Sequence, residues 1–556
     1  MSTKQRVRPV GKQRDVCASE APTLLVLGGA GTGKTVTAAA AARAHLLRSD
    51  AAATTGSARD RVLFLTFSRT AVTQILDRSR GILRDVADRV DVLTFHGLAW
   101  QLLFDFGRYS GHQERPALRG EAESKLFRKN PDVLSYNDLL PEALKILRLP
   151  HIGPLAQRRW SLVVCDEFQD TDSQQWALLE CLTAVGNRLL LLGDPNQMIY
   201  DKLPGRTGVG PERLMVAMAR PGAQQIRLPL GSYRDPTQLL PTVAEAVRQR
   251  NFTDPALTEA VANGRLRIVT GVDEDPAVQA VCDAIDESRQ QGADTFGIYL
   301  HGNEPTATMS AALTERGVDH VAVGLSESYG EALTTFLTML EFAAGTTRWS
   351  SVLVRMAVLY TSTVRSKQAP PLAFTIARGK AQGLLATRLD DLRVALADAA
   401  DLETAAQVAA KGWPSLGLDR GLRQWRRAAA DVTRLMTLSG YTLDPVSRQV
   451  EVTRLESFTD VDAGDGAAIQ VMNLHQTKGR ESDAVVVVFR ASDYHGNESE
   501  PFESASRLLY VVLTRARQQV TLLLPTSPHS LVAPFDALSP TSGPAARLSR
   551  LESLAE

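Results

Sequence analysis

Two short segments of this chain carry side chains suited to chemistry on phosphates, and the first is rich in glycine. Residues 28–35 read Gly-Gly-Ala-Gly-Thr-Gly-Lys-Thr and follow an apolar run at 24–27. Glycines let backbone N–H groups wrap a polyphosphate, and the N-terminus of a following helix adds partial positive charge. Lys34 is predicted to reach the β- and γ-phosphates, and the Thr35 hydroxyl to ligate Mg²⁺. The segment predicts an ATP site formed by Gly29, Ala30, Gly31, Thr32, Gly33, Lys34 and Thr35.

The second segment is a pair of acids, Asp166 and Glu167, directly after the apolar run 162–165. An acid at a strand tip can hold Mg²⁺ through water, the role predicted for Asp166. The next acid can orient and deprotonate an attacking water, the role predicted for Glu167. Combined with the phosphate loop upstream, this pair predicts ATP hydrolysis.

Alternating apolar runs and helical patterns must position these residues. Such alternation is typical of α/β cores with parallel sheets. A long helical region, 327–455, interrupts the second series of strands, which indicates a module inserted into a second core. The expected strands are 24–27, 62–66, 90–94, 162–165 and 189–192 in the first core, and 266–269, 295–300, 320–325, 469–473, 485–489 and 520–524 in the second.

Bulk composition excludes several classes of function. The 62 basic residues balance 62 acidic ones, so a nucleic acid would need a local groove instead of a global attraction. No apolar run approaches the length that spans a membrane, and the N-terminus does not resemble a secretory signal. We therefore expect a cytoplasmic protein without a membrane partner. The four cysteines lack metal-site spacing and are expected to be buried thiols: Cys17, Cys165, Cys181 and Cys282.

A series of motifs, in order from Gln13 to Arg517, resembles the UvrD/Rep-like superfamily 1A DNA helicases, with this chain a compact member. Residues 166–171 read Asp-Glu-Phe-Gln-Asp-Thr, the family's DEFQDT motif. The resemblance implies an α/β fold with two RecA-like P-loop parallel-sheet cores, mainly helical insertions, and ATP with Mg²⁺ between the cores. Further matches are motifs Ia (66–71), Ib (94–99), III (190–200), IV (230–234), V (471–481) and VI (507–517).

The resemblance also implies a division of the chain into domains. Its expected parts are domain 1A at 1–105 and 135–228, a short 1B insertion at 106–134, domain 2A at 229–326 and 465–538, a helical 2B-like insertion at 327–464, and a mobile tail at 539–556.

By the same resemblance, residues far apart in sequence share one nucleotide. Gln13 would read the adenine edge, Tyr233 would stack on adenine, and Glu481 would accept a hydrogen bond from a ribose hydroxyl. Three more residues would act at the γ-phosphate: Gln197 as a sensor, Arg234 as a contact from the second core, and Arg515 as an arginine finger.

A nucleic-acid groove is implied as well, through stacking and backbone contacts. Phe95 at a strand end also suits the core. One departure follows Tyr200, where the segment 201–204 has Lys202 and Leu203 in place of the family's aromatic residue and arginine. The residues expected to bind DNA are Thr66, Phe67, Thr94, His96, Tyr200, His475 and Lys478.

Three hypotheses for function follow. The leading one is an ATP-dependent translocase or helicase on single-stranded DNA or a tailed duplex, with 3′–5′ polarity by family, acting in repair, recombination or antiviral defence. The second is a nucleotide-gated regulatory ATPase that controls a partner such as a nuclease. The third is an RNA-directed motor, because backbone and stacking contacts do not select the sugar.

Overall fold

The computed structural model describes residues 9–539 with several gaps, and these residues form two compact units. One unit comprises Met1–Leu98, Ala143–Val323 and Gly464–Glu556, and the other Ala99–Glu142 and Gly324–Ala463. The predicted tail beyond residue 539 and the altered segment 201–204 lie outside the described residues. The gaps are 53–59, 68, 113–116, 128–132, 185, 201–207, 230, 324–326, 365–367, 419, 459–467 and 496.

The first unit contains two parallel sheets, as the sequence predicted, and each has six strands. In the first sheet the order is β3-β2-β6-β7-β1-β8. β8 was not predicted, because its Ala-Gln-Gln-Ile-Arg sequence lacks an apolar run and it lies half exposed at the sheet edge. The strands are β1 (Thr23–Leu27), β2 (Val62–Thr66), β3 (Val90–Thr94), β6 (Leu162–Cys165), β7 (Arg188–Gly193) and β8 (Ala223–Arg227).

Alternate residues of these strands bury one face of the first sheet. Val26, Phe64 and Val164 form one apolar cluster with Ala38 and Ala42 of the helix after the phosphate loop. The alanines let that helix pack closely, so the loop is held at the carboxyl end of β1. Helices in this part of the chain are α1 (Lys12–Ala18), α2 (Lys34–Ala52), α3 (Arg69–Leu83), α4 (Phe95–Phe106), α6 (Leu139–Leu147), α7 (Gly153–Gln157), α8 (Ser173–Leu182) and α9 (Pro211–Met218).

The second sheet has the order β11-β12-β10-β13-β14-β9. The strand predicted at 320–325 is reduced to Val321–Ala322, paired with β12. β12 follows the helical insertion and pairs with β10, which precedes it, so the insertion interrupts one continuous sheet. The strands are β9 (Leu266–Val269), β10 (Phe296–Leu300), β11 (Val321–Ala322), β12 (Ile469–Asn473), β13 (Ser482–Val488) and β14 (Ala516–Leu523).

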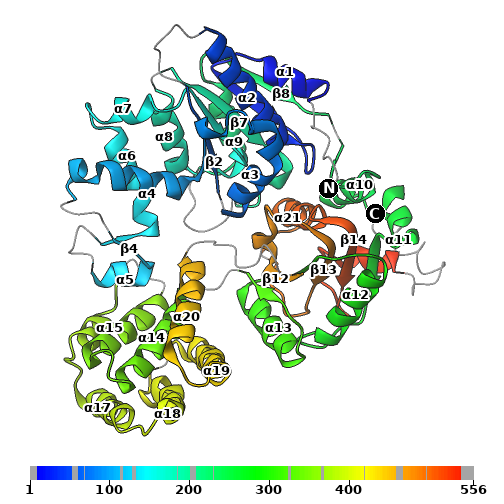
Figure 1. Cartoon of the computed structure of the whole chain (residues 1–556). Helices are drawn as coiled ribbons and strands as arrows, with labels where there is room; N and C mark the ends of the chain where they lie inside the picture. The colour runs from blue at the N-terminus through cyan, green and yellow to red at the C-terminus, as the bar shows by residue number, and fades with distance from the viewer. Residues whose placement is uncertain are drawn as a thin grey trace. The chain divides into compact units, whose positions relative to one another are not determined.

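Both faces of the second sheet are buried. Along β13, Val485 and Val487 enter a cluster with α10, α11 and α21, whereas Val486 and Val488 enter another with α12 and α13 (Figure 1). This two-residue alternation is the geometry of a strand covered on both sides. The helices are α10 (Leu239–Arg248), α11 (Pro255–Ala262), α12 (Val278–Gln290), α13 (Asn303–Glu315) and α21 (Glu503–Leu513).

The second unit is mainly helical. Its core stacks Trp413 on Trp425, with ring centroids 5.8 Å apart, and packs Phe336 5.5 Å from Trp425. Two short strands, β4 (Ala117–Arg119) and β5 (Val133–Ser135), belong to this unit with α5 (Glu121–Leu126). Its long helices are α14 (Glu327–Ala343), α15 (Trp349–Ser362), α16 (Pro371–Ala377), α17 (Gly383–Ala397), α18 (Leu402–Ser415), α19 (Leu422–Leu438) and α20 (Leu443–Phe458).

Removing the Phe336 ring is expected to destabilise this helical unit. Phe336 is fully buried, so Phe336→Ala leaves a cavity and should cost about 3–5 kcal/mol of unfolding free energy. Urea titration followed by tryptophan fluorescence measures the loss. Leu438→Ala is the control, because Leu438 is 77% exposed. Equal losses in the two variants would contradict the packing.

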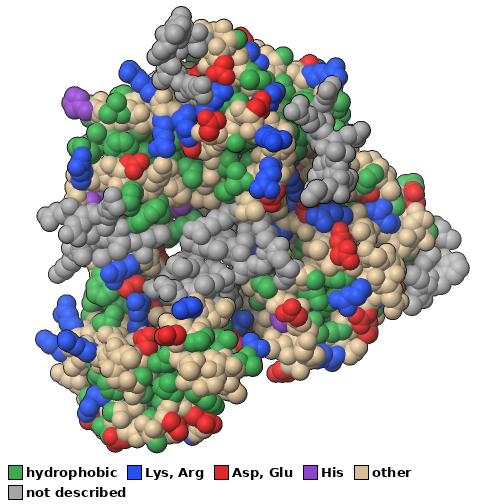
Figure 2. Space-filling view, in the orientation of Figure 1, with side chains coloured by type: hydrophobic (Ala, Val, Ile, Leu, Met, Phe, Trp, Pro, Cys, Tyr) green, Lys and Arg blue, Asp and Glu red, His purple; other side chains and the backbone are tan. Residues whose placement is uncertain are grey.

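The surface agrees with the balanced composition. On the face drawn in Figure 2, basic and acidic side chains are interspersed. None of the described helices combines the length and the apolar character that crossing a membrane requires.

Candidate active site

The phosphate loop lies between β1 and α2. Gly31 and Gly33 have φ of +75° and +80°, a backbone conformation that favours glycine. The Lys34 ammonium group donates hydrogen bonds to the carbonyls of Gly28 at 2.7 Å and Gly29 at 3.0 Å. The lysine predicted to reach phosphate is thus folded back over its own loop.

The two residues predicted to hold adenine lie beside one glycine of this loop. A Cβ on Gly33 would come within 3.3 Å of the Gln13 amide nitrogen and 3.4 Å of the Tyr233 ring. Tyr233 is 68% exposed, and its backbone N–H donates to the Gly31 carbonyl at 2.8 Å. An amide edge and an open aromatic face therefore flank the loop, as recognition of a base requires.

The acid pair lies at the carboxyl end of β6. Thr35 Oγ1 donates to Asp166 Oδ2 at 3.1 Å, so the two predicted magnesium ligands are adjacent. Glu167 has φ +52° and ψ +39°, a strained conformation for a residue with a Cβ and one that clusters at functional sites.

The two carboxyls differ in ionisation. Burial and the neighbouring Glu167 charge raise the pKa of Asp166 above its usual range. Burial acts in the same direction on Glu167, but Lys478 and Lys34 outweigh it and lower the pKa of Glu167. Glu167 is therefore the more acidic member of the pair and stays ionised, as a general base must be.

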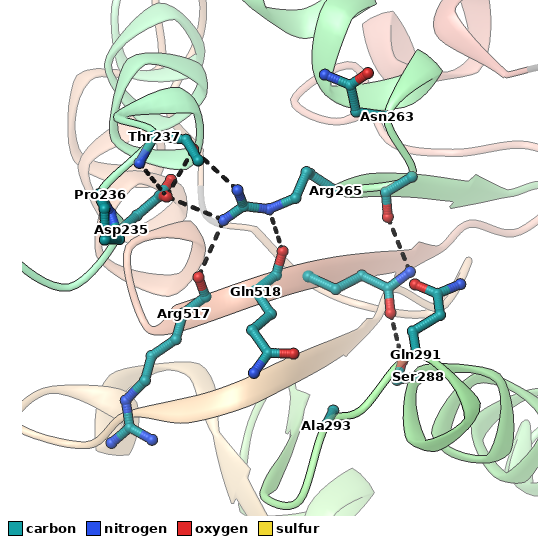
Figure 3. Close-up of a pocket in the computed structure, with 12 residues that line it drawn as sticks. Asp235, Pro236, Thr237, Asn263, Arg265, Ser288, Gln291, Ala293, Arg517 and Gln518 are labelled. Carbon is teal, nitrogen blue, oxygen red and sulfur yellow. Dashed lines mark hydrogen bonds and ion pairs between the residues drawn. The ribbon is translucent and has the colours of Figure 1, made fainter.

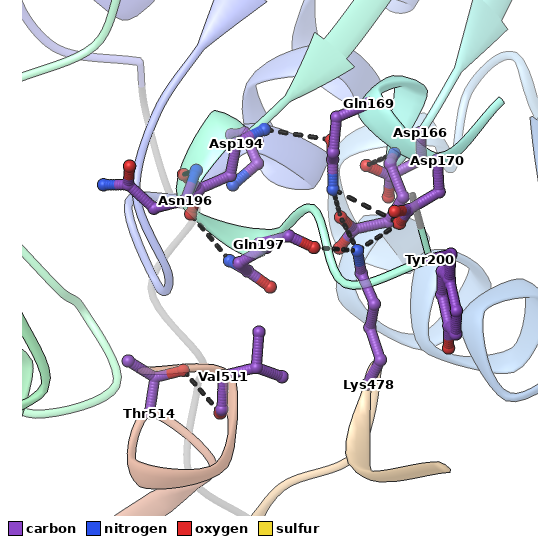
Figure 4. Close-up of polar contacts among 12 residues, drawn as sticks. Asp166, Gln169, Asp170, Asp194, Asn196, Gln197, Tyr200, Lys478, Val511 and Thr514 are labelled. Atoms are coloured by element: carbon purple, nitrogen blue, oxygen red, sulfur yellow. Dashed lines mark hydrogen bonds and ion pairs between the residues drawn. The ribbon is translucent and has the colours of Figure 1, made fainter. Parts of the chain in front are cut away.

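A chain of hydrogen bonds connects Glu167 to Arg515 of the second core, and Figure 4 shows its part from Gln169 through Asp194 to Gln197. Gln169 donates to Glu167 at 2.6 Å and accepts from the Asp194 backbone N–H at 3.0 Å. Gln197 donates to the Asp194 carboxylate at 2.8 Å, and its own amide oxygen accepts from Arg515 at 3.2 Å. Sequence reasoning did not assign Gln169 or Asp194, although both stand inside matched motifs.

Both predicted arginines point into this region. Arg515 is 3% exposed, and Arg234 donates to the Thr514 carbonyl and to the Glu481 carboxylate. Burial, with Arg515 nearby, lowers the pKa of Arg234 to about 10. Burial alone would raise the pKa of Glu481, but Arg234 and Arg78 hold it at about 2. The predicted ribose acceptor is an ionised group bound to arginines.

Helix α3 supplies two contacts that the sequence analysis missed. Arg78 donates to Glu481 at 2.7 Å, and Gln74 donates to the Gly479 carbonyl at 2.6 Å. These side chains are four residues apart and therefore share one helix face. That polar spacing directly after motif Ia is the signal that could have found them.

The predicted groove residues of motifs Ia and Ib follow neighbouring strands. Thr66 and Thr94 are register partners at the ends of β2 and β3. Phe67 and Phe95 have ring centroids 5.4 Å apart, and Phe95 is 1% exposed, so it belongs to the core. His96 is half buried in the first turn of α4.

Two further groove residues are in direct contact. The Tyr200 hydroxyl donates to the His475 carbonyl at 3.0 Å. Burial, and then the nearby His301, lower the pKa of His475, so its ring is neutral at pH 7.

Lys478 turns toward the acid cluster. Its ammonium group donates to Asp170 and to the Gln197 carbonyl at 2.7 Å, and lies 3.7 Å from Glu167. It is also 5.5 Å from the centre of the Tyr200 ring (Figure 4). Its side chain is only 7% exposed.

A separate pocket of about 370 Å³ lies in the second core (Figure 3). Its Arg265 donates to the Gln518 carbonyl, the Arg517 carbonyl at 3.0 Å and Thr237 at 2.9 Å, and lies 3.2 Å from Asp235. This guanidinium group is engaged in bonds that hold the walls together, so the pocket adds no residue to the candidate site.

Comparison with known proteins accounts for the order of these elements. Two overlapping segments, 10–130 and 121–202, match the family described as the UvrD/REP helicase N-terminal domain. The putative ATP-dependent DNA helicase YjcD of Bacillus subtilis is 21% identical over 92% of this chain and 78% of its own length. DNA helicase II of Salmonella typhimurium is 25% identical over 70% of this chain and 59% of its own length.

A shorter similarity adds a third relative. The RecBCD enzyme subunit RecB of Mycolicibacterium smegmatis is 40% identical over 82 residues, which are 14% of this chain and 8% of that protein. The chain thus spans little of RecB and about three fifths of DNA helicase II. With two parallel cores and this order of motifs, the chain is similar to the UvrD/Rep-like helicases, and its residues 10–202 match the N-terminal domain of that family.

Proposed function

We propose that this protein is an ATP-dependent translocase or helicase that acts on single-stranded DNA or a tailed duplex. One observation supports it most: Arg515 of the second core is hydrogen-bonded to Gln197, from which the chain through Asp194 and Gln169 reaches Glu167. The catalytic groups of the two cores are thereby linked. Such a link is what a motor needs to turn hydrolysis into movement of one core against the other.

In the proposed mechanism, the phosphate loop binds the phosphates of ATP. Lys34 leaves the carbonyls of Gly28 and Gly29 for the β- and γ-phosphates. Thr35 and Asp166 fit a Mg²⁺ site, because their oxygens already face each other at 3.1 Å and Mg²⁺ takes few protein ligands beside phosphate oxygens. The metal ion would neutralise phosphate charge.

Glu167 then orients the attacking water and accepts its proton. Gln169 holds the Glu167 carboxylate at 2.6 Å and so sets its direction. Arg234 and Arg515 stabilise the negative charge that develops on the transferred phosphoryl group. Arg234 must leave Glu481 to do so, which frees that carboxylate for the ribose.

The proposed groove for the strand comprises the ends of β2 and β3 and the pair Tyr200–His475. Hydroxyls and backbone amides would bind phosphates, while Phe67 would support a base. Movement in the 3′–5′ direction, and a role in repair, recombination or antiviral defence, complete the proposal.

An ATPase assay with nucleic acid tests this function. We expect single-stranded DNA to raise kcat about tenfold or more, because strand binding helps to align the two cores. Lys34→Ala should abolish the activity, and a 3′-tailed duplex should be unwound in preference to a 5′-tailed one. Absence of stimulation by either DNA or RNA of equal length would refute the motor. Preference for RNA would change the substrate but keep the mechanism.

A regulatory ATPase is the second candidate, favoured by the segment shared with RecB, which is by its name one subunit of a larger enzyme. Such a protein would hydrolyse ATP and gate a partner such as a nuclease, with little unwinding of its own. Unwinding by the purified chain alone, with several base pairs opened per cycle of ATP hydrolysis, would count against the regulatory role.

A further inference from the structure

We propose that Lys478 is a positioning residue for hydrolysis. In this proposal the Lys478 ammonium group, which belongs to the second core, pairs with the acid cluster of the first core, Glu167 and Asp170. The catalytic groups are aligned only while this ammonium group is in place. The inference rests on the proposed function, and it assigns Lys478 a task other than the backbone contact that the sequence suggested.

The contacts of the ammonium group carry this inference (Figure 4). Its nitrogen donates to Asp170 and to the Gln197 carbonyl at 2.7 Å, and lies 3.7 Å from Glu167. An ammonium group has three donors. Two acceptors of the first core are hydrogen-bonded to this group, and the Glu167 carboxylate lies within ion-pair distance.

Burial makes the pairing with Asp170 necessary. The Asp170 side chain is 1% exposed and that of Lys478 is 7% exposed. A buried carboxylate raises the free energy of the folded state unless a cation compensates its charge. Removing one partner therefore leaves the other charge buried without compensation. Asp170 would therefore shift or become protonated if Lys478 were neutral.

Asp170 is built into the backbone that carries the catalytic base. Its N–H donates to the Glu167 carbonyl at 3.0 Å, which closes the short turn Phe168–Asp170. A shift of Asp170 would thus move Glu167. The Gln197 carbonyl, held by the same ammonium group, belongs to the proposed γ-phosphate sensor. Lys478 fixes both catalytic segments at once.

The position of Lys478 in its loop links this contact to the proposed DNA groove. A lysine that binds a phosphate backbone presents its ammonium group to solvent. Here the group faces inward, while His475, three residues earlier, contacts Tyr200 in the proposed groove. In this proposal, one loop therefore contacts the bound DNA strand through His475 and the acid cluster through Lys478. Binding of the DNA strand can thus affect the position of the catalytic base, Glu167, through this loop.

Lys478→Met in the full chain tests the role. We expect kcat at saturating oligo-dT to fall about 10²-fold, as for a misplaced catalytic group, with KM for ATP nearly unchanged. The DNA dissociation constant and its salt dependence should match wild type, and Lys478→Arg should recover part of kcat by restoring the charge. Arg316→Met, which removes an exposed charge from the second core, is the control and should change none of these.

A double-mutant cycle with Asp170→Asn separates positioning from general damage. Each single change should lower kcat, and the double variant should be no worse than the poorer single one, because both buried charges are gone.

Two results would overturn the inference. One is an unchanged kcat in Lys478→Met. The other is weaker DNA binding with a salt slope smaller by about 0.7, the signature of one lost contact to a single-strand phosphate. An inactive wild-type protein would instead refute the proposed function.

Discussion

Glu167→Gln is expected to reduce kcat by about 10²–10⁴-fold, the usual contribution of a general base. Glutamine keeps the size and the hydrogen bond of the side chain, but it cannot accept a proton from water. Affinity for ATP should remain, because Glu167 does not hold the phosphates in the ground state. Steady-state hydrolysis with single-stranded DNA measures kcat, and a fluorescent ATP analogue measures affinity.

Glu180→Gln provides the matched control for this prediction. Glu180 is an exposed acid on α8 of the same core, so its replacement should leave kcat and ATP affinity at wild-type values. If Glu167→Gln retained most of the wild-type kcat, another group would have to activate the water. The mechanism proposed above would then lose its base.

Arg515→Ala should lower kcat by roughly 10³-fold, the lower range for loss of an arginine finger. Arg515 is buried and hydrogen-bonded to Gln197 at 3.2 Å, so its removal takes away a link between the cores and the charge that the proposed mechanism places at the reacting phosphate. Arg515→Lys should not restore activity, because lysine lacks the planar fork of donors. Single-turnover hydrolysis separates this loss from weaker binding.

Arg517 offers a comparison two residues away in the same motif. Its side chain is 42% exposed and pairs with Asp483 at 3.1 Å. Surface pairs contribute little, so Arg517→Ala should change kcat by no more than about threefold. Equal losses in Arg515→Ala and Arg517→Ala would show that the motif contributes a general basic surface instead of one catalytic arginine.

Much of the two cores was predictable from local sequence. Strands such as β2 and β6 were located to the residue, because continuous apolar runs mark strands buried on both faces. β8 escaped detection, since an edge strand needs no apolar run. β11 was overestimated, because an apolar run alone does not determine how far pairing extends.

Within the candidate site, motifs identified the phosphate loop and the acid pair, since each occupies consecutive residues with one chemical purpose. The contacts between distant segments were a different matter. The spacing on α3 marks Arg78 as a candidate but does not identify Glu481 as its partner. No spacing places Lys478 beside Asp170, because in both pairs the partners are hundreds of residues apart.

The sequence alone was sufficient to predict an ATP site, the parallel cores and the resemblance to the helicase family. These depend on short-range patterns: a glycine turn between strand and helix, apolar runs, and motifs in order. The fold was needed to establish which way each charged side chain faces. Lys478 appears in a motif expected to bind nucleic acid, yet burial drives its charge to the nearest buried carboxylate. A buried charge must find a partner in space, and only the packing of the cores supplies one.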